Sequence, residues 1–101
     1  MRQRSGGVVP DYGIFETDEF LKKLAKLPAR DAARIRRKLD EQVYAQLKKE
    51  PFFGRNIKKL RGYSPDIWRY RIGKFRMFYA VDEEDRLVCI LTINLRRDAY
   101  R

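Results

Sequence analysis

The sequence contains no histidine and only one cysteine among its 101 residues. The lack of histidine excludes a serine–histidine–aspartate triad, a histidine-ligated metal site and an imidazole general base. The single cysteine, Cys89, excludes an internal disulfide and suits a reducing compartment. We therefore expect a cytoplasmic protein that uses no metal ion and no other cofactor.

Long hydrophobic runs are also absent. The longest apolar stretch, residues 87–93, is far shorter than the roughly 18 residues of a membrane span, so no membrane association is expected. The first ten residues, MRQRSGGVVP, place no apolar stretch behind their arginines and do not resemble a secretory signal. We expect residues 1–10 to form a flexible tail and residues 11–101 to form a single domain.

Two helices are predicted in the N-terminal half. Thr17 or Asp18 can cap the first helix, which Pro28 ends, and the second begins at Asp31 and ends near Pro51. Each carries one apolar stripe, so the pair should form a helical hairpin that buries one face. The stripes consist of Phe20, Leu21, Leu24 and Leu27, and of Ile35, Leu39, Val43 and Leu47.

The apolar pattern changes to a period of two in the C-terminal half. Strands are predicted at residues 12–16, 67–72, 75–81 and 87–95, with a further short strand at 57–60. Gly73 and Lys74 suit a two-residue hairpin turn. The pattern predicts an α+β fold of order β-α-α-β-β-β, in which a small antiparallel sheet carries the N-terminal helical hairpin on one face.

The hairpin register assigns each side chain to a face of the sheet. One face, which the helices can cover, carries Trp68, Tyr70, Ile72, Phe75, Met77 and Tyr79. These aromatic and aliphatic side chains are expected in the core rather than on a base-stacking surface. Cys89 is expected to be an inert core thiol. Tyr63 is assigned to neither packing nor ligand contact.

Positive charge is concentrated on the opposite face. The whole chain has a net charge of +10, and residues 55–76 contain eight basic residues against Asp66 alone. Arg71 should lie directly opposite Arg76, with Arg69 one step along, although like charges opposite each other cost up to about 1 kcal/mol. Bound phosphate would offset that cost, because guanidinium groups bind phosphate bidentately. Nucleic acid is the natural partner of such a patch.

The alternative interpretation is a solvated arginine stripe. In that case Asp66 or Glu83 would pair with some of the arginines. Charge alone does not separate a phosphate-binding face from a solvated one.

The basic half of the chain resembles a known family. The segments NIKKLRGY at 56–63 and WRYRIGKFR at 68–76, followed by Tyr79, Val81 and a terminal RRDAYR, resemble the RelE/ParE superfamily of type II toxin–antitoxin toxins. The resemblance extends from about residue 12 to residue 101. It implies a RelE-like fold and, for the RelE branch, an mRNA interferase. Such an endoribonuclease inhibits translation by cutting mRNA in the ribosomal A site, through metal-free attack of the ribose 2′-hydroxyl on the adjacent phosphate.

The resemblance also implies site residues and partners. The catalytic positions that it implies are Arg69, Arg71, Arg76, Arg96 (or Arg97) and Tyr100. Further basic residues, expected to contact RNA, are Lys58, Lys59, Arg61, Lys74 and Arg97. The implied partners are the ribosome, mRNA and a cognate RelB-like antitoxin in a hetero-oligomer.

The implied chemistry lacks a general base. Fixed cations such as Arg76 suit the charge that develops on phosphate oxygens, and Tyr100 can stack on a base. However, the type enzyme of the family carries lysine where Arg69 and Arg71 stand, and arginine does not release its proton. Two other functions therefore remain open: a ParE-like DNA gyrase inhibitor on the same fold, and a non-catalytic RNA-binding relative.

Overall fold

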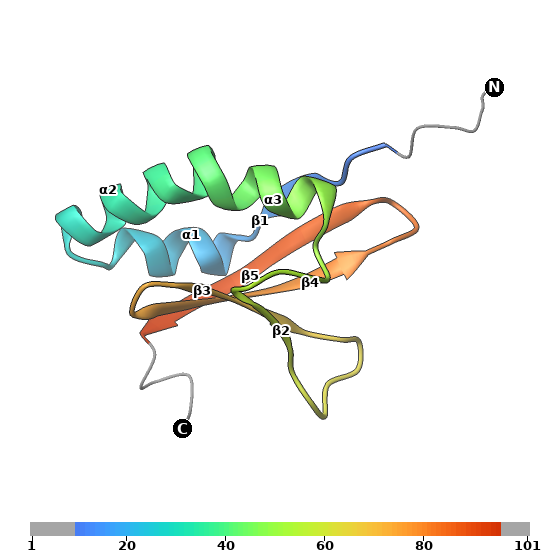
Figure 1. The fold of residues 1–101 in the computed structure, drawn as a ribbon. Coiled ribbons are helices and arrows are strands. Elements are labelled where there is room, and N and C mark those ends of the chain that lie inside the picture. Colours follow the sequence, from blue (N-terminus) through green and yellow to red (C-terminus); the bar gives the residue numbers. More distant parts are fainter. Residues whose placement is uncertain (1–9, 96–101) are drawn as a thin grey trace.

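The structure, a computed structural model, describes residues 10–95. The helices lie together on one face of a twisted sheet, and the other face is uncovered (Figure 1). The predicted α+β class and the one-sided packing of the helical hairpin are confirmed. None of the helices in the described range is both long and apolar enough to cross a bilayer.

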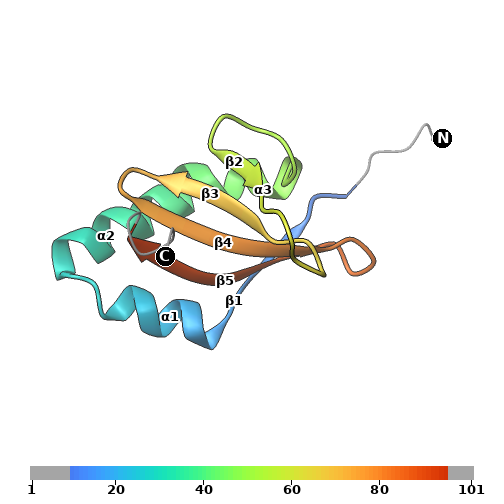
Figure 2. The same ribbon diagram turned by 90° about the horizontal axis from the view of Figure 1, so that it is seen from below.

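The sheet has five strands in the order β1-β5-β4-β3-β2, seen from the uncovered side in Figure 2. All five correspond to strands predicted from the sequence, including the short strand at 57–60, which pairs with β3 and which the order β-α-α-β-β-β does not count. The strands are β1 (Gly13–Glu16), β2 (Ile57–Lys59), β3 (Trp68–Ile72), β4 (Phe75–Asp82) and β5 (Leu87–Leu95).

The sheet is mixed rather than wholly antiparallel as expected. β1 pairs parallel to β5, with Gly13 opposite Leu87 and Glu16 opposite Ile90. The chain between them crosses over one sheet face through the helices, and such a crossover permits parallel pairing. The other three strand pairs are antiparallel.

The helices begin and end close to the predicted positions. Thr17, not Asp18, caps α1 (Asp18–Ala25), where its hydroxyl accepts a hydrogen bond from the Phe20 amide at 3.2 Å. Phe20 and Leu24 are buried, whereas Leu21, expected in the same stripe, is exposed. Leu21 follows Phe20 by one position and so points more than a quarter turn away around the helix.

The second helix is continuous but changes its winding. It consists of α2 (Ala29–Lys38), a π-helical segment η1 (Leu39–Val43) and α3 (Tyr44–Lys49). A stripe spaced by four residues drifts around an α-helix of about 3.6 residues per turn. The wider π turn counteracts this drift. All four predicted stripe residues are therefore buried: Ile35, Leu39, Val43 and Leu47.

The β3–β4 hairpin has the predicted register. Ile72 lies opposite Phe75, and Arg71 lies opposite Arg76. Gly73 occupies the first turn position with φ +57°, a conformation that glycine adopts without strain. Of the six side chains predicted for the covered face, five are buried and Trp68 is half-buried. Cys89 is not in the core as expected, since it lies half-buried on the uncovered face opposite Ala80.

A polar cluster joins β1 to the long helix. The Glu16 carboxylate accepts two hydrogen bonds from Arg36, at 2.5 and 3.2 Å, and a third from the Tyr44 hydroxyl at 2.5 Å. Partial burial raises the pKa of Glu16, but the hydrogen bonds and the charge of Arg36 outweigh it, so the pKa lies below its ordinary value. Burial and the neighbouring Glu16 raise the pKa of Tyr44, which therefore stays protonated as a donor.

We predict that Glu16→Gln lowers the free energy of unfolding by about 1–3 kcal/mol at pH 7. Because the pKa of Glu16 is lower in the folded state, its stabilisation is present above the unfolded-state pKa and is lost as pH falls through the folded-state value. Urea denaturation between pH 7 and pH 3 should therefore show the gap between wild type and Glu16→Gln closing at acidic pH.

The matched control is Asp40→Asn. Asp40 also pairs with Arg36, at 3.0 Å, but its side chain is 58% exposed against 22% for Glu16. Exposed pairs contribute little, so Asp40→Asn should cost less than about 0.5 kcal/mol. Equal losses from the two substitutions would contradict the assigned role of Glu16.

Candidate functional site

The basic residues of the uncovered face form rows across neighbouring strands. One row places Lys58 of β2 opposite Arg69 of β3, and Arg69 opposite Phe78 of β4. The adjacent row places Arg71 opposite Arg76. Side chains directly opposite each other lie about 4.5–5.5 Å apart at their Cβ atoms, so these cations are close neighbours, as the alternation predicted.

A cavity of about 230 Å³, here called the basic pocket, lies on this face. It gathers four of the predicted site residues from β2, β3, β4 and the loop after β2. Its cationic lining is Lys58, Arg61, Arg69 and Arg76, and its apolar and aromatic lining is Leu60, Tyr63 and Phe78. The two kinds of lining give the pocket the character of a site for a ligand that is both anionic and partly flat.

Arg76 is the most constrained of these cations. It was expected on an open surface, yet it is only 3% exposed. Its Nη1 donates hydrogen bonds to the carbonyl oxygens of Gly73 and Phe75, at 3.1 and 3.0 Å. The guanidinium is therefore held in place by the backbone of its own hairpin.

Neither Arg76, which is buried, nor Arg69, which is half-buried, has an anionic partner within residues 10–95. No carboxylate in this range pairs with Arg69 or Arg76, and the Nε atoms of both are buried without a hydrogen-bond partner. Asp66, expected as a competing partner for the arginines, pairs with Lys59 at 3.4 Å. Burying a charge without a partner is costly, so an anionic ligand in the basic pocket would be strongly favoured.

Three predicted residues lie outside the basic pocket. Arg71 is exposed and lines a separate cavity of about 200 Å³ beside Lys38 and Asn56. Lys59 follows Lys58 on β2 and so points to the opposite face of the strand. Its ammonium forms an ion pair with the Asp66 carboxylate.

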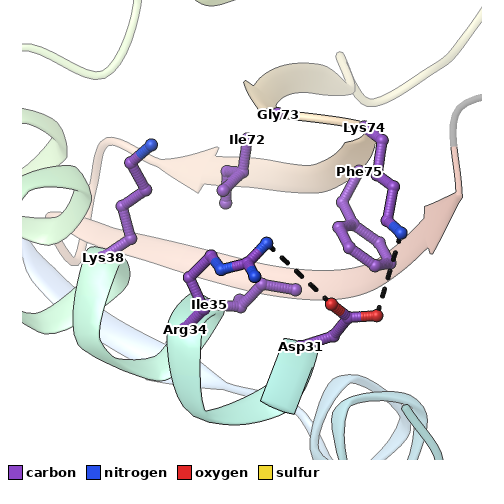
Figure 3. Close-up of a pocket in the computed structure, with 8 residues that line it drawn as sticks. All are labelled: Asp31, Arg34, Ile35, Lys38, Ile72, Gly73, Lys74 and Phe75. Atoms are coloured by element: carbon purple, nitrogen blue, oxygen red, sulfur yellow. Dashed lines mark ion pairs between the residues drawn. The ribbon is translucent and has the colours of Figure 1, made fainter. Parts of the chain in front are cut away.

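Lys74 lies on the helix side of the hairpin. Figure 3 shows it reaching toward Asp31, which also faces Arg34, in a pocket of about 280 Å³ between α2 and the turn. The ion pairs are 3.9 and 4.0 Å long. The carboxylate of Asp31 partly neutralises these cations, so an external anion is less strongly favoured in this pocket than in the basic pocket.

Arg96, Arg97 and Tyr100 lie outside the described residues. Their predicted roles therefore stay predictions.

The sequence did not single out the aromatic part of the site. Tyr63, left unassigned between packing and contact, is 56% exposed and lines the basic pocket. Phe78 lies two residues after Arg76 on the same strand, and this period of two is the signal that could have identified it.

The described part of the chain contains no cluster of three or more histidine, cysteine or acidic side chains that could hold a metal ion. The Asp82–Asp85 turn is exposed, and Asp82 accepts a hydrogen bond from the amide of Asp85 at 3.1 Å. This geometry is that of a solvated turn.

The basic pocket predicts specific stabilisation by phosphate. Inorganic phosphate, added at constant ionic strength, should raise the melting temperature by roughly 2–5 °C as the pocket fills. Arg69→Gln should abolish this rise, whereas Lys22→Gln, on the exposed surface of α1, should retain it. A rise of the same size in Arg69→Gln, measured by differential scanning calorimetry, would contradict anion binding in the pocket.

Comparison with known proteins agrees with this geometry. The sequence pattern of the family described as "ParE toxin of type II toxin-antitoxin system, parDE" matches residues 14–100. A Methanocaldococcus jannaschii protein that carries the name toxin RelE1 is 36% identical over 81 residues, which cover 80% of this chain and 86% of that protein.

Two solved structures of similar proteins share the fold. The toxin–antitoxin complex RelBE2 from Mycobacterium tuberculosis contains a chain with 31% identity and a TM-score of 0.67, covering 87% of this chain and 100% of that one. The archaeal RelE–RelB complex from Pyrococcus horikoshii contains one with 26% identity and a TM-score of 0.65, covering 85% and 96%. The chain therefore belongs to the RelE/ParE family of type II toxins.

Proposed function

We propose that this toxin is a ribosome-dependent endoribonuclease that cleaves mRNA in the basic pocket and so inhibits translation. The observation that carries the proposal is the buried guanidinium of Arg76, which pairs with no carboxylate of residues 10–95 and lies among three further cations. A phosphodiester supplies the missing negative charge, and its nucleobases match the aromatic part of the lining. The site of action would be the cytoplasm, where ribosomes translate mRNA.

The proposed reaction is attack by the ribose 2′-oxygen on the adjacent phosphorus. The O2′–P bond forms and the P–O5′ bond breaks, leaving a 2′,3′-cyclic phosphate and a 5′-oxygen that takes a proton from solvent water to become a 5′-hydroxyl. Negative charge grows on the non-bridging oxygens, where Arg69 and Arg76 would stabilise it. Because Arg76 is already fixed by Gly73 and Phe75, little reorganisation accompanies the step.

The 2′-hydroxyl must lose its proton, and arginine cannot accept it. Among the residues lining the basic pocket, Lys58 carries the only amine. It stands opposite Arg69 on the edge strand β2. We assign to Lys58 the removal of this proton; this role goes beyond the RNA contact expected from the sequence.

The proposed partner in the resting state is a RelB-like antitoxin. The similar P. horikoshii and M. tuberculosis toxins were solved in complexes with their antitoxins. An acidic segment of such a partner could cover the basic face of this toxin, whose net charge is +10.

The first test is induced expression with mapping of mRNA 5′ ends. Wild type should arrest growth and produce new ends within translated codons. Arg76→Ala should reduce cleavage by about 10²–10³-fold, the usual effect of removing one fixed charge-stabilising donor. Lys22→Ala is the matched control on the helix side and should cleave like wild type.

The second test separates charge from proton transfer at Lys58. Both Lys58→Ala and Lys58→Arg should lose cleavage, because arginine keeps the positive charge but cannot accept the proton. Phosphate binding, measured by calorimetry, should survive in Lys58→Arg. Full cleavage by Lys58→Arg would reduce the role of Lys58 to charge alone.

A second candidate function is inhibition of DNA gyrase. It is favoured by the family pattern that matches residues 14–100, which describes ParE toxins. Growth arrest with intact mRNA, DNA double-strand breaks and an SOS response would establish gyrase inhibition and overturn the ribonuclease proposal.

A further inference from the structure

A second cavity adjoins the basic pocket on the uncovered face of the sheet. It has a volume of about 370 Å³, within the usual range of small-ligand sites, and is here called the apolar pocket. It is lined by Leu60, Tyr63, Ile67, Phe78, Leu91, Thr92 and Asn94. Leu60, Tyr63 and Phe78 also line the basic pocket, so the two cavities share a wall.

One row of directly opposed residues runs from one pocket into the other. Lys58 lies opposite Arg69, Arg69 opposite Phe78, and Phe78 opposite Thr92. Since neighbouring strands are about 4.8 Å apart, Arg69 and Thr92 are separated by the width of two strand spacings. A ligand that extends along this row would meet cations first, then an aromatic ring, then a hydroxyl.

The strand irregularity in β5 shapes the apolar pocket. Phe78 pairs with Thr92 but Tyr79 pairs with Ile90, so Leu91 is an extra residue in a β-bulge. The bulge places Leu91 and Thr92, consecutive residues, together in the lining of one cavity. Bulges commonly redirect side chains beside functional sites.

Thr92 is one of the residues that line this cavity. Its Oγ1 is buried and has no hydrogen-bond partner within residues 10–95. By contrast, the Asn94 side-chain oxygen already accepts a hydrogen bond from Lys23 at 2.8 Å. A buried hydroxyl without a partner is unfavourable, and a ligand with a hydrogen-bonding edge would satisfy it.

We infer that the apolar pocket receives a nucleobase of the nucleotide whose phosphate occupies the basic pocket, and that the Thr92 hydroxyl discriminates among bases. This inference rests on the proposed function. Within a nucleotide the ribose separates phosphate from base, as Phe78 separates Arg69 from Thr92 in the row. Tyr63 and Phe78 supply the aromatic surface on which unpaired RNA bases stack.

Continuity with the cationic site selects this occupant over an apolar side chain of a protein partner. The shared wall joins the apolar pocket to Arg69 and Arg76, whose positive charges favour binding of a phosphate. An aliphatic side chain would leave the Thr92 hydroxyl without a partner, whereas each nucleobase offers donors and acceptors on its edge.

The test is titration of the ¹⁵N-labelled full chain with inorganic phosphate and with the four nucleoside monophosphates, followed by NMR. Phosphate should shift the amide signals of Lys58, Arg69 and Arg76. The nucleotides should also shift Leu91 and Thr92, with dissociation constants that differ about three- to tenfold among the bases.

Two substitutions at this position isolate the hydroxyl. Thr92→Val removes the hydroxyl but keeps the branched shape, and should abolish the difference among bases while phosphate still binds. Thr92→Ser keeps the hydroxyl and should retain the base preference. Phe78→Ala should weaken the binding of every nucleotide by more than it weakens the binding of phosphate, because stacking is lost for all four bases.

The outcomes separate this inference from the ribonuclease proposal. The base pocket is overturned if the nucleotides shift only the amide signals that phosphate also shifts, or if they do not bind at all. This holds whether or not the toxin cleaves mRNA. Unchanged base preference in Thr92→Val would overturn the role of the hydroxyl. Base-dependent shifts at Thr92 in a toxin that produces no new mRNA ends would support the base pocket and reject the ribonuclease.

Discussion

The register of the β3–β4 hairpin is the constraint on which the rest of the molecule depends. Side chains alternate between the two faces of a strand, so a shift by one residue would exchange the faces completely. The two-residue turn at Gly73 and Lys74 prevents this by placing Ile72 opposite Phe75. As a result the aromatic core lies under the helices, and the arginines lie on the face that the helices leave uncovered (Figure 1).

The same turn also holds the central cation of the site. Arg76 donates to the carbonyl oxygens of Gly73 and Phe75, so the residues that determine the register also orient the guanidinium. On the neighbouring strand, the bulge at Leu91 alters the regular alternation and opens a second cavity beside the first. Regular pairing therefore builds the basic pocket, and a local departure from it builds the apolar one.

Local patterns predicted most of this fold. The hairpin register followed from strict alternation and a two-residue turn, and the buried helix stripe followed from apolar residues four apart. The parallel pairing of β1 with β5 could not be predicted, because the two strands are more than 70 residues apart. Neither segment has a sequence pattern that indicates the direction of its partner strand. The π-helical segment and the β5 bulge likewise reflect packing against other elements.

The site was predicted less completely than the fold. Alternation placed Arg69 and Arg76 on one face, but it predicted neither the burial of Arg76 nor the presence of Leu60, Tyr63 and Phe78 in its pocket. Lys58 and Lys59 are equivalent in the sequence, yet only Lys58 faces the pocket, since the edge strand turns alternate side chains in opposite directions. Thr92 carries no sequence signal, because the role proposed for it rests on a hydroxyl that has no hydrogen-bond partner within residues 10–95.

The position of β5 has a consequence for the synthesis of the protein. β5 lies between β1, which is made first, and β4, and it contributes the buried Val88, Ile90 and Ile93. Until these residues leave the ribosome, β1 has no strand to pair with and α1 lacks the surface that it packs against. Folding dominated by such distant contacts is slow to begin. The basic pocket is lined by residues between Lys58 and Phe78, but the core that supports it is completed only when β5 joins the sheet.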